Sequence, residues 1–165
     1  MEKILKDISY LSILVGEAVA TKEQIENNWL GFKPATSNEI KETEQRLGLK
    51  LPEDYISFLK VTNGFAVSDN IEPSFLPVQD IKYLRDIDPF IIEAYGLEEL
   101  ERAIFISGSD EEQHFFLIHP KEDGEKWRYW KFANWYPGEH EFESLENYFE
   151  NVFEFLNKIR DDDHQ

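Results

Sequence analysis

The side chains that most often do chemistry are few in this sequence, and the four histidines come first. His114 and His119 stand five residues apart in one expected strand, so their side chains point to opposite faces. His140 falls in a polar stretch and His164 in the charged tail. A hard-metal cluster of His114 with the acidic residues 110–112 is conceivable, but its spacing matches no standard motif. We therefore predict structural or solvated histidines and no metal site.

The other familiar catalytic patterns are also missing from the sequence. The stretch Ser107-Gly108-Ser109 lacks the Gly-x-Ser-x-Gly elbow of a serine nucleophile. The 8 glycines form no phosphate-binding loop. The chain has no cysteine, which excludes a disulfide, a cysteine zinc site and a thiol nucleophile. None of these patterns therefore calls for a catalytic residue or a cofactor.

A cluster of large rings offers a different kind of site. Trp127, Tyr129, Trp130, Trp135 and Tyr136 fall within ten residues, and Pro137-Gly138 and the acidic Glu139, Glu141 and Glu143 follow them. Exposed Trp and Tyr beside acidic groups are typical of a protein-binding patch. The alternative is that Trp127 or Trp130 belongs to the core and Trp135 packs under the last helix, since large rings are mostly buried.

The charge restricts the partners of such a patch. The 165 residues include 34 acidic and 17 basic side chains, giving a net charge of −17. This charge argues against duplex nucleic acid or an anionic membrane as partner. Residues 1–60 have 10 acidic and 8 basic side chains, whereas residues 61–165 have 24 and 9. The excess is either a solubilising surface or a face that attracts a basic protein.

Helices are expected at the start of the chain. Apolar residues three and four apart predict a helix over residues 2–19, and Thr21 with Gln24 predicts a capped second helix that ends at a left-handed Gly31. A third helix begins at Thr36 and ends at Gly48. A fourth begins at Pro52 and stops at Asn63-Gly64.

The middle of the chain is expected to form strands. We predict strands over 74–78, 103–107, 113–119 and 127–132, a helical turn over 80–85, a short helix over 88–96, and loops over 108–112 and 135–141. The unbroken apolar run 115–118 indicates that both faces of the sheet are covered. Ser144 caps a long amphipathic helix at the end. The predicted fold class is α+β, with a central, mostly antiparallel sheet surrounded by helices.

No repeat, linker or targeting segment is visible. The 19.5 kDa chain is the size of one domain, so residues 1–165 are assigned to a single domain. The apolar run from Tyr10 to Val15 is too short to cross a bilayer, and the cytoplasm is the expected location.

Residues 29–64 have a distinctive order. Residues 46–55 read Arg-Leu-Gly-x-x-Leu-Pro-x-Asp-Tyr, preceded by Trp29-Leu30-Gly31 and Pro34-Ala35-Thr36 and followed by Phe58-Leu59 and Thr62-Asn63-Gly64. This pattern closely resembles the SUKH superfamily of Smi/Knr-type proteins. A weaker resemblance continues through residues 105–110, the aromatic strand and the last helix. The resemblance covers residues 25–158 and leaves the first 20 as a variable helical extension.

The resemblance implies an α+β fold and, in the bacterial branch, an immunity protein that binds and neutralises a toxin, often a nuclease or deaminase. It also implies that the protein is not an enzyme. The shared positions set the framework, and the partner-binding positions vary with the toxin. Charge and aromatic content therefore select the contact regions, the 110–112 turn and the 135–141 loop. The predicted contact residues are Asp110, Glu111, Glu112, Trp135, Tyr136, Glu139 and Glu141.

The fungal relatives suggest an alternative, a regulatory scaffold or adaptor without a toxin partner, acting in cell-wall or signalling control. The identity of the toxin and the oligomeric state stay open at this point.

Overall fold

The fold was examined in a computed structural model that describes residues 1–66, 68–69, 72–107, 113–133 and 136–162. The helices are α1 (Glu2–Leu14), α2 (Lys22–Glu26), α3 (Ser37–Leu47), α4 (Glu53–Val61), α5 (Leu84–Ile87), α6 (Pro89–Tyr95) and α7 (Leu145–Asp162), with 3₁₀ turns η1 (Val78–Asp80) and η2 (Glu98–Arg102). The strands are β1 (Lys82–Tyr83), β2 (Ala103–Phe105), β3 (Gln113–Ile118), β4 (Arg128–Ala133) and β5 (Tyr136–Phe142). They form one antiparallel sheet in the order β1-β2-β3-β4-β5, which confirms the α+β prediction.

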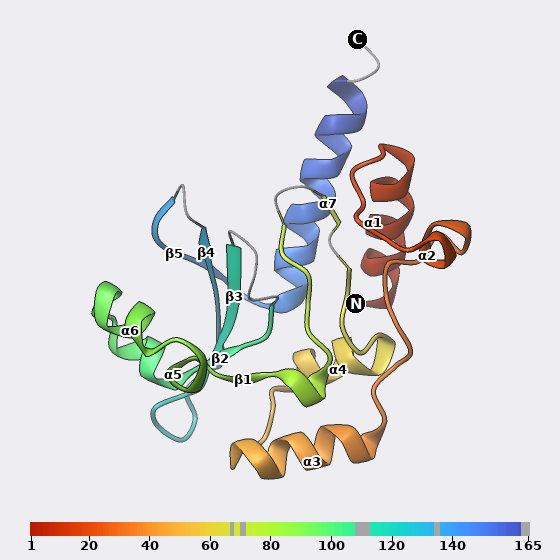
Figure 1. Cartoon of the computed structure of the whole chain (residues 1–165). Coiled ribbons are helices and arrows are strands. Elements are labelled where there is room, and N and C mark those ends of the chain that lie inside the picture. Colours follow the sequence, from red (N-terminus) through yellow and green to blue (C-terminus); the bar gives the residue numbers. More distant parts are fainter. Residues whose placement is uncertain (67, 70–71, 108–112, 134–135, 163–165) are drawn as a thin grey trace.

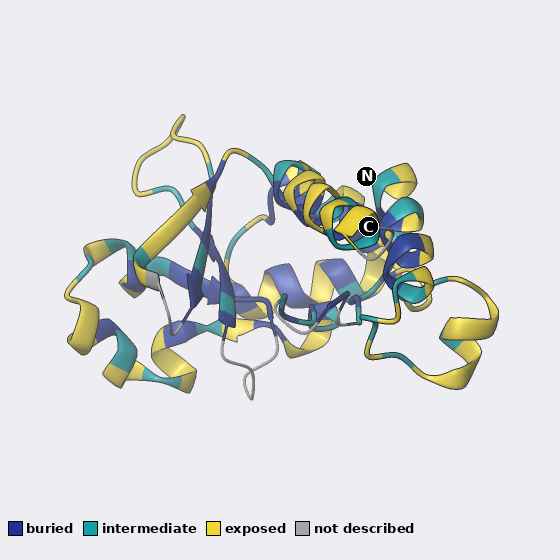
Figure 2. Ribbon diagram, turned by 90° about the horizontal axis from the view of Figure 1, so that it is seen from above, coloured by how far each residue is buried: buried dark blue, intermediate teal, exposed yellow. Residues whose placement is uncertain are grey.

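Helices cover both faces of this sheet, as the apolar run in β3 predicts. Phe115 and Leu117 join the larger core, which is shared with α1, α4 and α7. Phe116 and Ile118 join a smaller core under α5, α6 and η2. Figure 1 shows α1 and α7 side by side, with α5 and α6 at the far end of the sheet, and Figure 2 shows the buried strands between the two groups.

Three of the capping signals in the first half of the chain are confirmed. Thr36 accepts a hydrogen bond from the backbone N–H of Glu39, and the Glu39 carboxylate accepts one from the N–H of Thr36. The same reciprocal pair forms between Thr21 and Gln24. Gly48 ends α3 in the left-handed conformation, with φ of 73°. These termini depend on neighbours in sequence, which is why the pattern predicts them.

Several predicted boundaries are wrong. Helix α1 ends at Leu14 instead of Val19, and Asn28, with φ of 50°, takes the left-handed position expected of Gly31. Gly31 is required for another reason, since a Cβ there would lie 2.4 Å from the Trp29 ring. Among the described residues, the predicted strand over 74–78 makes only two isolated bridges, both through Phe75. The predicted helical turn over 80–85 is interrupted by strand β1, which lies between the 3₁₀ turn η1 and helix α5.

The largest correction concerns residues 135–141, which the sequence indicates to be a loop. Residues from Tyr136 onward form β5, which pairs with β4 in the register His140↔Lys131. Pro137 and Gly138 argue against a central strand, but β5 is an edge strand, where a residue without an N–H donor is tolerated. The register shifts between Lys131 and Ala133, and Gly138 has φ of 85°, so the strand begins with an irregularity.

Asp54 fastens α4 to the sheet and to the last helix. Its carboxylate accepts hydrogen bonds from the Tyr129 hydroxyl on β4 and from the backbone N–H of Leu145 at the start of α7, the latter at 3.3 Å. Burial raises the pKa of the Tyr129 hydroxyl, and its hydrogen bond to Asp54 raises it further. The aspartate of the Leu-Pro-x-Asp-Tyr motif therefore has a structural role.

Candidate partner-binding surface

The two predicted contact regions connect to one end of the sheet. Asp110, Glu111, Glu112 and Trp135 lie outside the described residues. The described residues that flank these positions are paired in the sheet: Gln113 stands opposite Ala133, and Ala133 stands opposite Tyr136. The two contact regions, whose residues 112 and 135 are more than 20 positions apart in sequence, are therefore attached to neighbouring strands at the same end of the sheet. Their roles as contact residues stay predictions.

Glu139 and Glu141 are both exposed on β5, in different electrostatic settings. Glu141 accepts hydrogen bonds from Arg128 Nη2 at 2.6 Å and from the Trp130 indole Nε1 at 2.7 Å. The bonds from Arg128 hold the pKa of the Glu141 carboxyl below its usual range, and the bonds to Glu141 raise the pKa of Arg128. Glu139 has no cationic side chain within ion-pair distance in the described part of the chain.

The aromatic cluster divides between the two cores. Trp130 is 1% exposed in the smaller core, and Tyr129 is 3% exposed in the larger one. Trp127 is half-buried against His119. Trp130 and Tyr129 are therefore core residues. They are neighbours in sequence because β4 is buried on both faces, so that consecutive rings enter opposite cores.

A run of glutamates extends from β5 into α7. Residues 139–154 contain six glutamates and no lysine or arginine, and all six glutamates are exposed. Glu141 pairs with Arg128, and Glu146 pairs with the amino group of Met1. In the described ranges the other four have no cationic partner: Glu139, Glu143, Glu150 and Glu154. We call residues 139–154 the acidic segment.

A groove of about 220 Å³ lies between β5 and α7. Its apolar lining includes Phe142 and Phe155, and Phe155 is 36% exposed. Its polar lining includes an ion pair between Lys131 Nζ and Glu72 Oε1 at 2.8 Å, with side chains 14% and 12% exposed. The Tyr148 hydroxyl also donates to Glu72 at 2.6 Å. We call this the β5–α7 groove.

Sequence reasoning missed this groove for an identifiable reason. Lys131 and Glu72 are 59 residues apart, and no local pattern connects them. The available signal was Lys131 itself, a lysine on the face of β4 that also holds Tyr129, because a charge in such a place needs a partner. Phe155 gave no signal, since it is one apolar residue among many on α7.

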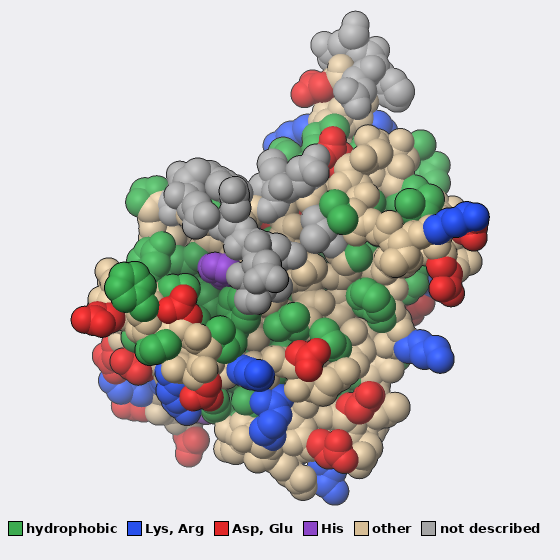
Figure 3. Space-filling view, in the orientation of Figure 1, with side chains coloured by type: hydrophobic (Ala, Val, Ile, Leu, Met, Phe, Trp, Pro, Cys, Tyr) green, Lys and Arg blue, Asp and Glu red, His purple; other side chains and the backbone are tan. Residues whose placement is uncertain are grey.

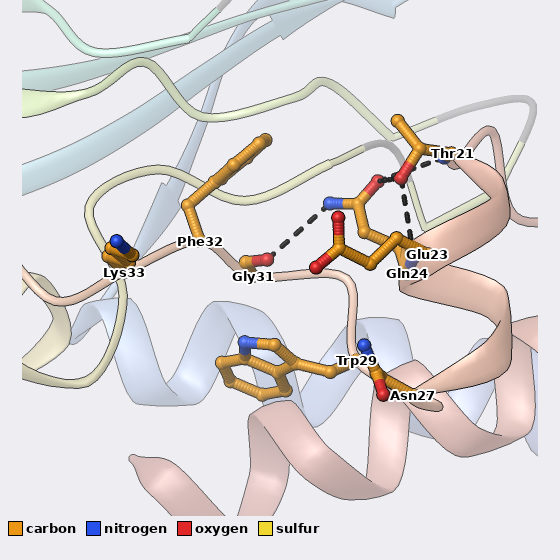
Figure 4. A pocket seen from close by; sticks show the side chains of 8 residues that line it. All are labelled: Thr21, Glu23, Gln24, Asn27, Trp29, Gly31, Phe32 and Lys33. Carbon is orange, nitrogen blue, oxygen red and sulfur yellow. Dashed lines mark hydrogen bonds between the residues drawn. The ribbon is translucent and has the colours of Figure 1, made fainter.

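A second cavity, of about 450 Å³, opens beside α2 (Figure 4). Trp29 and the half-exposed Phe32 line it, together with Gln24, whose amide donates to the Leu30 carbonyl oxygen at 3.0 Å. Among the described residues that line it, Glu23 is the only acidic one and none is a histidine. The lining therefore suits contact with an apolar group better than acid–base chemistry.

Further exposed apolar side chains lie away from the predicted contacts. In the view of Figure 3 they lie among acidic side chains over α5 and α6, where Phe90 is 72% and Tyr95 45% exposed. The described residues contain no group of three or more His, Asp or Glu arranged to hold a metal ion. None of the helices in the described ranges has the length and apolarity needed to cross a membrane.

Comparison with known proteins places the fold in a family. Curated proteins give no significant match to the chain. The model of the SMI1 / KNR4 family (SUKH-1) matches residues 34–158, which runs from the segment before α3 into α7 and leaves α1 and α2 outside. Since the match spans most of the 165 residues, the chain belongs to the SMI1 / KNR4 family (SUKH-1).

Proposed function

We propose that this protein is a non-enzymatic immunity protein that binds a basic toxin domain and masks its active cleft. Family membership supports this proposal, because the SUKH resemblance implies toxin partners in bacteria. The observation that carries it on the structure is the acidic segment, with four exposed glutamates that have no cationic partner in the described part of the chain. A protein that neutralises a toxin by covering its active cleft needs no catalytic group.

The acidic segment has an energetic disadvantage within the fold. Glu150 and Glu154 are four residues apart on α7, and like charges at this spacing destabilise a helix by roughly 0.2–0.5 kcal/mol. The same glutamates attract a basic surface that approaches the acidic segment. Opposite potentials accelerate encounter and select the partner. A toxin that acts on nucleic acid needs such a basic surface to hold phosphates.

The first test is affinity capture of partners from the native cell, washed at low and then at high salt. We expect a basic toxin domain whose association is slowed by salt. Co-expression of that domain with this chain should restore growth of cells that the toxin alone kills. Recovery of cell-envelope or signalling enzymes with no toxin would refute the proposal and favour the adaptor role.

A charge-matched pair of variants locates the effect. The first variant replaces four glutamates by glutamine within the acidic segment: Glu139, Glu143, Glu150 and Glu154. The control variant makes the same replacement at four exposed glutamates elsewhere, each also without a cationic partner in the described residues: Glu23, Glu42, Glu93 and Glu122. We expect the first to lower the association rate by about tenfold or more and the control by about threefold or less. Equal losses would show that only net charge matters.

A further inference from the structure

β5 is the longer of the two edges of the sheet. The opposite edge strand, β1, has 2 residues, whereas β5 has 7. Strand β4 is its only pairing partner among the described residues. Every second residue of an edge strand directs its N–H and C=O away from the sheet. β5 therefore offers a row of backbone donors and acceptors to another strand.

Backbone protection against such pairing is confined to the first half of β5. Proline and β-bulges are the backbone devices that blunt an edge. Here Pro137, Gly138 and the register shift lie at the start of the strand. From His140 to Phe142 the register with β4 is regular, with three consecutive pairs. The second half of β5 is therefore a straight edge without these devices.

The β5–α7 groove lies beside this straight half. His140 and Phe142 line it from β5, and Phe155 lines it from α7. A strand added to β5 would direct alternate side chains toward the α7 side of the sheet. An apolar side chain at such a position can contact the exposed part of Phe155. Backbone pairing and a side-chain pocket are the two components of recognition by strand addition.

Charge selects the occupant of this edge. β5 contains Glu139 and Glu141 and no lysine or arginine, and Glu143 follows it. A second copy of the chain, paired through its own β5, would bring acidic strands side by side, which is unfavourable. A strand rich in lysine and arginine would instead place cations near Glu139 and Glu143. The edge thus suits a basic partner and disfavours self-association.

We propose that β5 accepts an extended, basic segment of the partner as a sixth strand, with an apolar side chain in the β5–α7 groove. This inference rests on the proposed function for the identity of the partner as a basic toxin domain. It adds how the partner binds: backbone hydrogen bonds to the straight half of β5, with Glu139 selecting positive charge.

The test uses the full chain and a short synthetic peptide in which lysine alternates with valine and leucine. Binding is followed by amide NMR and by hydrogen exchange. We expect shift changes at residues 139–142 and in the groove, and slower exchange of the β5 amides. A peptide with glutamate in place of lysine should not bind.

Two N-methylated peptides separate strand addition from electrostatic adsorption. N-methyl groups are placed on the odd positions of one peptide and on the even positions of the other. Only one of these sets faces β5 in an added strand, so we expect one peptide to lose binding and the other to retain it. Equal binding of both, or shift changes centred on α1 and α2, would overturn the inference.

A matched pair of protein variants checks the site. Glu139→Lys should weaken binding of the unmodified peptide by about tenfold or more, whereas Glu93→Lys on α6 should change it by about twofold or less. Equal effects would contradict the assignment. If the peptide docks on β5 and no toxin is neutralised, the proposed function fails and the strand site stands. If a toxin binds while the β5 amides exchange at their free rates, the strand site fails and the function stands.

Discussion

Replacement of Lys131 by methionine tests whether the Lys131–Glu72 ion pair of the β5–α7 groove stabilises the contact between the sheet and the segment before Phe75. The Lys131–Glu72 pair joins residues 59 positions apart, and both side chains are nearly buried, at 14% and 12% exposure. Methionine fills much of the volume of the lysine chain but leaves the Glu72 carboxylate without its cation. Of the contacts described above, the Tyr148 hydroxyl bond remains.

The expected cost follows from this burial. Breaking a buried ion pair from one side costs about 3–5 kcal/mol, whereas an exposed pair contributes less than about 1 kcal/mol. Because both partners retain some contact with water, we expect the free energy of unfolding to fall by about 3 kcal/mol. For a chain of this size that corresponds to a fall in Tm of about 6–12 °C.

Urea unfolding followed by tryptophan fluorescence measures the change as a lower midpoint at constant slope. The control is Lys3→Met, which breaks the pair between Lys3 and Asp7, where the lysine is 89% exposed. The double variant Glu72→Gln/Lys131→Met should be more stable than the sum of the single losses predicts, by about 1–2 kcal/mol. A loss no larger than that of Lys3→Met, or strictly additive losses, would refute the reasoning.

Three further substitutions test other parts of the fold. Tyr55→Phe should raise stability by about 1 kcal/mol in thermal unfolding, because the fully buried Tyr55 hydroxyl has no hydrogen-bond partner among the described residues; a loss of stability would contradict this. Gly64→Ala should lower the free energy of unfolding by more than about 2 kcal/mol, since Gly64 has φ of 101° and an added Cβ would lie 2.9 Å from a carbonyl oxygen. The control Gly16→Ala should lower it by about 1 kcal/mol, because Gly16 has φ of 76° but open space around it. Glu141→Gln should lower stability at neutral pH by less than about 1 kcal/mol. Because Arg128 lowers the pKa of Glu141, this stabilisation is present above the pKa of the unfolded state and is lost as the pH falls through the pKa of the folded state. The stabilities of the two proteins should therefore become equal in acid. A difference in stability that grows on acidification would contradict the assignment.

Local signals account for most of what the sequence predicts well. The ends of α3 are set by Thr36, Glu39 and Gly48, which lie within 13 residues, and the pattern places them correctly. The apolar run in β3 predicts two covered faces because a strand has only two sides. The family resemblance rests on the same region of dense local signals.

The failures share a dependence on distant partners. Pro137 and Gly138 are typical of a loop, and only the position of β5 at the edge of the sheet makes them compatible with a strand. The sequence left open whether Trp130 is exposed for binding or belongs to the core, and only the two separate cores show that Trp130 and Tyr129 are buried. The groove needs β5, α7 and Glu72 together, and no sequence window contains all three.

The pairing of α1 with α7 has a consequence for how the chain acquires its structure. Strands β1 to β5 pair in chain order, so the sheet can grow by successive local hairpins. Helix α1 ends at Leu14, whereas α7, which lies beside it, begins at Leu145. During synthesis the apolar side chains of Leu5, Ile8 and Leu11 therefore lack this partner until Leu145 and the residues after it have been made. Until then the apolar side of α1 is open to chaperones or to other nascent chains.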